Sequence, residues 1–276
     1  MLKRPTAFPH AASGEPAVRG SLKAVALPSE HGGWGLTLEP VALGLLAAPG
    51  WAGLGLGVSA LAAFLVRHPL RLWHSDVRKG KRYRRTALAL LVALGYGCVG
   101  VLGFVLAAAQ AQGPFVWPLV LAVPLALLQF SYDARGRGRN LVPEFSGATA
   151  MSSVVAAIAL AGGLPWTTAA GLWLVLAMRA LGALSYARAQ VMRARGVPVN
   201  PAPAYAAEVA ATGVLAVAAL AGLSPWMSVA GMGLLVVFSA YTFALPPVPA
   251  RVVGWTQVAF GLLMVILTAL GVRVGL

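Results

Sequence analysis

The chain has 276 residues, of which 59% are hydrophobic and only 10% are charged, and its mean hydropathy is +0.80. Soluble domains carry about 25% charged residues, so this composition excludes an ordinary soluble fold and indicates a chain that needs lipid as its solvent. The formal net charge of +14 at pH 7 comes from 21 Lys and Arg against 7 Asp and Glu. Because no basic stretch belongs to a soluble fold, we expect no nucleic-acid partner.

The apolar stretches are long runs of Ala, Leu, Val and Gly rather than ten-residue alternations. In lipid every backbone N–H and C=O must be paired, which leaves helices or closed barrels, and a barrel requires alternating strands. The sequence therefore predicts an all-α polytopic membrane protein, with the lipid bilayer as its surroundings.

The first segment, residues 1–27, contains prolines and charges but no apolar core of the kind found in a signal peptide. We expect it to be a disordered basic cytoplasmic tail. The remaining residues, 28–276, are expected to form a single nine-helix transmembrane domain. With about 20 apolar residues for each crossing, the nine predicted helices are 29–48, 51–73, 84–109, 114–132, 141–162, 165–186, 203–221, 225–244 and 252–274.

The even-numbered predicted helices begin alike, with a proline followed by a tryptophan. Proline suits the first turn of a helix, and tryptophan favours the headgroup level of a bilayer. These four turns contain no Lys, Arg, Asp or Glu, whereas the segment 67–85 alone holds eight basic residues: Arg67, Arg71, Arg78, Lys79, Lys81, Arg82, Arg84 and Arg85. The positive-inside rule therefore places the basic loops and the N-terminus in the cytoplasm.

Charged side chains inside spans are costly, so each one suggests an ion pair, a cavity or a function. On the first predicted helix, Glu30 and His31 lie near the cytoplasmic end. On the second, Arg67, Arg71 and His74 recur at helical spacing and form a cationic stripe, with Asp76 beyond them.

The later helices place further polar residues at the same end. The fourth predicted helix closes with Tyr132 and Asp133, and the fifth opens with Glu144. The sixth carries Arg179, about two turns inside the membrane, and Tyr186.

Two interpretations of these side chains stay open. They can surround a cytoplasm-facing cavity in which guanidinium groups bind a phosphate or carboxylate. Alternatively, the arginines extend toward the membrane surface and the acids pair with them structurally. The four histidines show no HxxxH or HExxH spacing, so we predict neither a metal site nor another cofactor.

Several motifs resemble those of the YwiC-like family of bacterial membrane proteins. They are PSEHGGW at 28–34, RHPL at 67–70, GKRYRR at 80–85, RNLVPEFSG at 139–147 and SYAR at 185–188. The resemblance implies a multi-pass protein of the bacterial inner membrane, but it implies little chemistry.

A more distant resemblance is to the UbiA-type prenyltransferases, in which nine helices form a bundle with polar cytoplasmic loops after helices 2, 4 and 6. That likeness implies a UbiA-like bundle holding an isoprenoid diphosphate. The family's Asp-rich motifs and Mg²⁺ are not matched, because Asp76 is the lone aspartate after the second helix and no acid lies between Tyr186 and Asn200.

These observations lead to one main functional hypothesis and two alternatives. The main hypothesis is that the protein binds an amphipathic isoprenoid or lipid with an anionic head on Arg67, Arg71 and Arg179, with or without a divergent transferase activity. The alternatives are a small-anion transporter and a non-catalytic membrane accessory factor. The sequence does not decide whether the protein is an enzyme.

The predicted topology can be checked with a fusion at Gly163, in the charge-free turn after the fifth predicted helix. An alkaline phosphatase fused there is expected to be active and a green fluorescent protein fused there dark, because the turn lies outside the cytoplasm. The opposite pair of signals would overturn the topology.

Overall fold

The computed structural model describes residues 22–27, 32–80, 83–135, 137 and 140–275. Among these residues every regular element is a helix. Eight of the helices are long and apolar enough to cross a membrane, and α2 is a shorter apolar helix. The expected all-α polytopic membrane protein is thereby confirmed.

The helices are α1 (Leu22–Ala26), α2 (Gly32–Ala47), α3 (Trp51–Arg78), α4 (Arg84–Gln110), α5 (Val116–Ala134), α6 (Leu141–Ala161), α7 (Trp166–Ala194), α8 (Ala202–Leu220), α9 (Trp226–Ala244) and α10 (Ala250–Val274). Helices α2 to α10 correspond one to one with the nine predicted from the sequence. Six of them begin and end within two residues of the predicted positions.

Two helices are longer than predicted, α3 by five residues and α7 by eight at the C-terminus. The predicted ends were placed where the charged residues begin, but charged residues do not terminate a helix. The helices end further along the chain, at the glycines that follow the C-caps Lys79 and Arg195. These are Gly80 and Gly196, with φ of 65° and 74°. Glycine adopts this left-handed conformation without steric cost, so it ends helices well.

The helix α1 was not expected, because it falls within the predicted tail. It packs against α3 and α4. Its carbonyls are held by side chains of those helices: His68 Nε2 lies 3.1 Å from the Ala24 oxygen, and the Tyr96 hydroxyl donates to the Ala26 oxygen at 3.2 Å. The rest of the predicted tail, residues 1–21, lies outside the described residues.

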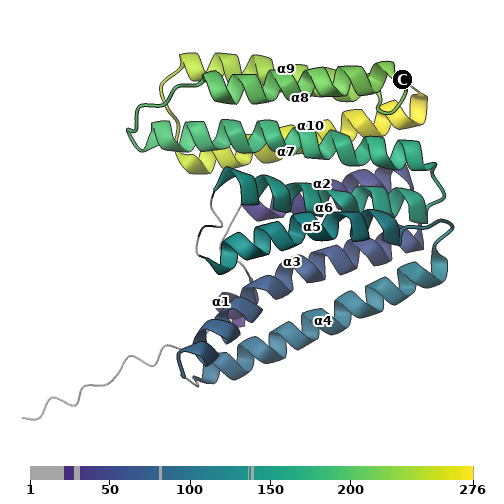
Figure 1. Cartoon of the computed structure of the whole chain (residues 1–276), viewed down its shortest axis with the longest axis vertical. Coiled ribbons are helices and arrows are strands. Elements are labelled where there is room, and N and C mark those ends of the chain that lie inside the picture. The colour runs from purple at the N-terminus through teal and green to yellow at the C-terminus, as the bar shows by residue number, and fades with distance from the viewer. Residues whose placement is uncertain (1–21, 28–31, 81–82, 136, 138–139, 276) are drawn as a thin grey trace, which may run out of the picture.

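Helix α2 lies in the middle of the bundle, behind α6 in Figure 1, and packs against α3, α6, α7 and α10. Helix α6 is buried along an unbroken run from Ser152 to Ala161. Its glycine neighbours allow this contact, since a Cβ on Gly44 of α2 or Gly53 of α3 would lie under 3 Å from Ile158. A second apolar core joins α7 to α8, α9 and α10 around Leu215 and Met232.

The two ends of the bundle differ in composition. The C-termini of α3, α5 and α7 lie at one end (Figure 1), which we call the charged end because the arginines and lysines gather there. The C-termini of α4, α6 and α8 lie at the other, which we call the Pro/Trp end. The charge separation expected between alternate loops is thus a separation in space.

Helices α3 and α4 form a pair that runs obliquely to the others (Figure 1). Small residues bring their backbones together: a Cβ on Gly103 would lie 2.7 Å from the Gly55 oxygen, and the Ser59 hydroxyl donates to the Gly100 oxygen at 2.8 Å. Close packing through small residues is a common basis of helix association in lipid. The opposite face of α4 exposes large apolar side chains, including Leu91 and Leu102, which suits contact with lipid.

We expect the substitution Gly103→Ala to lower stability, because the added methyl group would collide with Gly55 and Ser59; overpacking of this kind costs about 1 to 3 kcal/mol. The matched control is Gly97→Ala on the same helix, where a Cβ meets nothing within 4 Å. Alanine favours helix over glycine by up to about 1 kcal/mol. Thermal unfolding in mild detergent should therefore separate the two variants, and equal melting temperatures would contradict the packing described.

Candidate functional site

The described residues predicted for the site lie at or near the charged end, except Arg179, and their contacts divide them into several groups. Glu30 and His31 lie outside the described residues. His74 is exposed and Tyr132 is half-buried. The carbonyl of Tyr132 accepts the backbone N–H groups of Arg135 and Arg137, which closes the C-terminus of α5.

The first group joins α3 to α5. Asp133 Oδ2 accepts a hydrogen bond from Arg67 and lies 3.7 Å from the Arg71 guanidinium. The two arginines are four residues apart, so they lie on one face of α3. The sequence predicted this stripe and placed Asp133 near it, but it did not show that one carboxylate serves both arginines.

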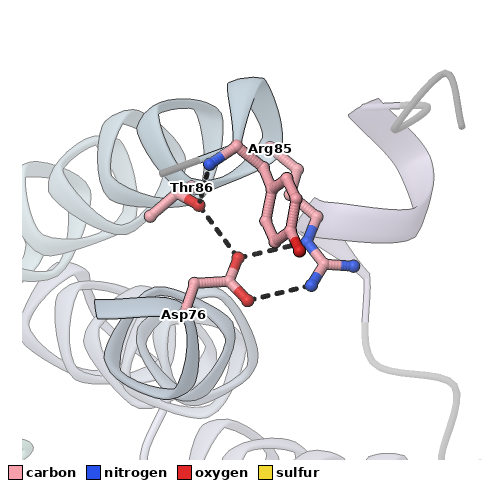
Figure 2. Close-up of polar contacts among 4 residues, drawn as sticks. Asp76, Arg85 and Thr86 are labelled. Atoms are coloured by element: carbon pink, nitrogen blue, oxygen red, sulfur yellow. Dashed lines mark hydrogen bonds and ion pairs between the residues drawn. The ribbon is translucent and has the colours of Figure 1, made fainter. Parts of the chain in front are cut away.

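The second group holds the α3–α4 hairpin together (Figure 2). Asp76 is 4% exposed, and its two oxygens accept hydrogen bonds from Arg85 Nη2 at 2.9 Å and Arg85 Nε at 3.1 Å. The Thr86 hydroxyl donates to the same carboxylate at 2.9 Å and accepts the backbone N–H of Tyr83 at 3.1 Å. Asp76 and Arg85 thus form a bidentate ion pair, in which two parallel hydrogen bonds fix the orientation of the guanidinium group as well as pairing the charges.

Two further predicted residues, Glu144 and Tyr186, have partners on neighbouring helices. Arg188 of α7 donates to Glu144 of α6 at 3.0 Å. The buried Tyr186 shares a hydrogen bond with Thr242 of α9 at 3.0 Å. Both contacts join helices near the charged end.

Arg193, beyond the predicted end of α7, closes the C-terminus of α9. It donates to the carbonyl oxygens of Phe243 and Leu245 at 3.2 and 2.9 Å and to Gln190 Oε1 at 3.0 Å. A cation at this position satisfies carbonyls that have no partner within the helix.

Arg179 stands apart from these surface groups, because only 3% of it is exposed. Its Nη2 lies 3.5 Å from Glu39 of α2 and donates to the Gln257 carbonyl of α10 at 2.7 Å. Its Nη1 donates to Gln257 Oε1 at 3.2 Å. Arg179 therefore ties three helices together in the interior of the bundle.

Glycine makes room for this ion pair. A Cβ on Gly261 of α10 would overlap the Glu39 carboxyl group. Because Gly261 lies one turn after Gln257, the carboxylate rests against the same face of α10 that receives Arg179.

A second buried acid, Glu208 of α8, lies beside the same part of α7. It is 0% exposed, and its Oε1 accepts a hydrogen bond from the Ser239 hydroxyl of α9 at 2.7 Å. Its Cγ would lie 3.3 Å from a Cβ on Gly182, which is one turn from Arg179.

Sequence reasoning missed two of these residues as members of the site, Glu39 and Gln257. For Glu39 the available signal was simple, since it is an acid within an apolar segment, where charge is costly. Among the described residues, no group of three or more His, Cys, Asp or Glu could hold a metal ion.

Comparison with known proteins gives one match. Residues 27–159 match the family model described as YwiC-like protein. This part of the chain is YwiC-like. No curated protein and no solved structure shows significant similarity to the chain. The resemblance read from the sequence is confirmed over these residues, and the likeness to UbiA-type enzymes stays a prediction.

The YwiC-like region ends within α6, so two of the ion pairs cross its boundary. Glu39 and Glu144 lie inside the region, and their partners Arg179 and Arg188 lie beyond it. The YwiC-like helices and the helices that follow them therefore share charged contacts.

The hairpin contact of Asp76 can be tested by Asp76→Asn. Loss of the carboxylate removes the bidentate ion pair with Arg85, so the C-terminus of α3 should fray. Trypsin should therefore cut the chain faster after Lys79. Glu144→Gln, which removes an ion pair between α6 and α7, should leave that cleavage rate unchanged. Equal rates in Asp76→Asn and the native protein would show that this contact does not hold the hairpin.

Proposed function

We propose that this YwiC-like protein lies in a bacterial inner membrane and binds an amphipathic lipid or isoprenoid with an anionic head group. The head would bind Arg67 and Arg71 at the charged end, and the apolar tail would lie along the neighbouring helices.

The observation that carries the proposal is the exposed guanidinium of Arg71 in the α3–α5 group. Arg67 and Arg71 lie on one face of α3 and both face the carboxylate of Asp133, which accepts a hydrogen bond from Arg67. The Arg71 contact is long, at 3.7 Å, and 58% of that side chain is exposed. Its planar guanidinium can therefore bind a phosphate through two hydrogen bonds while Asp133 stays with Arg67.

The surroundings of these arginines suit an amphipathic ligand. Leu70 on α3 and Leu127 and Phe130 on α5 are large, apolar and exposed, and they lie within two turns of the arginines or of Asp133. Basic residues that border such apolar surface are typical of sites for anionic lipid head groups.

Arg179, which the sequence placed beside Arg67 and Arg71, is not assigned to this head group. It is nearly fully buried and is bonded to Glu39 and Gln257. Asp76, the nearest acid in sequence to these arginines, is bonded to Arg85 and Thr86. The proposed head-group site therefore consists of Arg67 and Arg71.

The test is native mass spectrometry of the detergent-purified protein with added phosphatidylglycerol and with phosphatidylcholine of the same acyl chains. A basic residue near a membrane surface contributes about 1 kcal/mol to attraction of an anionic lipid, which is about fivefold in affinity. We expect Arg71→Ala to weaken phosphatidylglycerol binding about fivefold and the double change with Arg67→Ala to weaken it further. Arg71→Lys should have an intermediate affinity, because lysine keeps the positive charge but lacks the planar guanidinium group that donates two parallel hydrogen bonds.

The matched control is Arg195→Ala, since Arg195 is an exposed residue just after α7, and it should bind phosphatidylglycerol as the native protein does. Two outcomes would overturn the proposal. One is native-like binding in the double variant, and the other is equal retention of phosphatidylcholine by the native protein.

A further inference from the structure

The interior of the bundle contains two carboxyl groups and one guanidinium group that the proposed lipid site does not use. They belong to Glu39 of α2, Arg179 of α7 and Glu208 of α8, and we call them the buried triad. Arg179 lies 13 residues after the start of α7, about 20 Å along the helix at 1.5 Å per residue. The hydrocarbon core of a bilayer is about 30 Å thick, so this depth is within the membrane.

The buried triad has more acids than bases. With both carboxyl groups ionised its net charge would be −1, and an uncompensated charge in a low-dielectric interior is strongly unfavourable. One bound proton would make the triad neutral.

Among the described residues, the neighbouring helices supply no further positive charge to the triad. Toward the triad α9 presents Ser239 and α10 presents Gln257, both neutral. Helices α3 and α6 contribute apolar core residues such as Leu56 and Ile158 near α2.

The other charged or titratable groups that the structure describes on the surrounding helices lie toward the ends of the bundle. Arg193 and Tyr205 lie toward the charged end, where Arg193 bonds the last carbonyls of α9. Glu144 lies there too and pairs with Arg188. Arg273 of α10 bonds the Leu46 carbonyl at the Pro/Trp end.

The contacts of the two acids differ. Glu39 lies next to the Arg179 guanidinium, which favours its ionised form. Glu208 uses only one oxygen: Oε1 accepts from Ser239, whereas Oε2 is buried and has no hydrogen-bond partner among the described residues. A protonated carboxyl group can become a donor through that oxygen.

Polar side chains lead from Glu208 toward the charged end. Ser239 bonds Glu208, and one turn further along α9 the Thr242 hydroxyl lies 3.2 Å from the Ser239 carbonyl. Thr242 also contacts Tyr186 and Gln190 of α7, and Gln190 contacts Arg193. In the other direction Leu215, Met232 and Leu235 form a closed apolar core. Polar groups therefore approach Glu208 from the charged end.

We propose that the buried triad is a proton-binding site within the membrane. Glu208 takes up one proton from the charged end, while Arg179 stays paired with Glu39. Release of that proton leaves a second carboxylate to compete for Arg179, so the contact of α7 with α2 and α10 depends on the occupancy of Glu208.

Infrared difference spectroscopy tests this directly, because a protonated carboxyl group has a C=O stretch that a carboxylate lacks. The native protein in detergent is expected to show one buried protonated carboxyl group per chain near neutral pH. Glu208→Gln should abolish that signal, and Glu144→Gln at the charged end should keep it.

The variant Glu39→Gln distinguishes charge sharing from burial alone. If the triad shares its charge, removing Glu39 leaves one carboxylate for one guanidinium, and the proton on Glu208 should be lost. If burial alone protonates Glu208, the signal should persist. Arg179→Gln should give two protonated groups instead of one.

A structural variant checks the result without removing any charged group. Gly261→Ala should displace the Glu39 carboxyl group and alter the signal, whereas Gly254→Ala on the same helix should not, because a Cβ there meets nothing within 4 Å. The proposal is overturned if the native protein shows no buried protonated carboxyl group, if Glu208→Gln retains it, or if Glu39→Gln leaves it unchanged.

Discussion

The constraint on which this structure depends is that charge must be compensated inside an apolar bundle. Arg179 meets it by bonding to two helices at once, through Glu39 of α2 and Gln257 of α10. Those contacts are possible because glycine leaves space for a carboxyl group at Gly261. The position of α2 in the middle of the bundle follows, since it brings one of the acids that the buried arginine needs.

The same constraint is weaker at the charged end, where water and lipid head groups are near. There the ion pairs between Arg188 and Glu144 and between Arg85 and Asp76 are partly exposed on the arginine side. Exposed pairs of this kind contribute little stability, often less than about 1 kcal/mol. A bidentate arginine still fixes the relative orientation of the two side chains. The pair at Asp76 accordingly orients the α3–α4 hairpin, while the triad at Arg179 determines which helices can lie at the centre.

The sequence predicted the number and order of the long helices because lipid imposes a length and an apolar composition on every span. It misplaced the ends of α3 and α7, because the change from apolar to charged residues marks the membrane boundary and not the helix end, which glycine sets. The sequence did not predict which residues the site residues contact. A helix such as α6, apolar nearly all round, shows no face from which its neighbours could be inferred. Glu39 was not predicted as a site residue, because its partner Arg179 lies far along the chain.

The pairing of Glu39 with Arg179 also bears on how the chain is made. Arg179 follows Glu39 by 140 residues (179 minus 39). At roughly 5 to 20 residues per second of synthesis, Arg179 is made on the order of ten seconds after Glu39. During that time α2, with 16 residues and an internal proline, has neither this partner nor Arg273, which bonds its last turn through the Leu46 carbonyl. Helix α2 is therefore synthesised before the eight long helices, but it gains its charged contacts only after α7 and α10 have been made, so the YwiC-like region is complete only when α10 arrives.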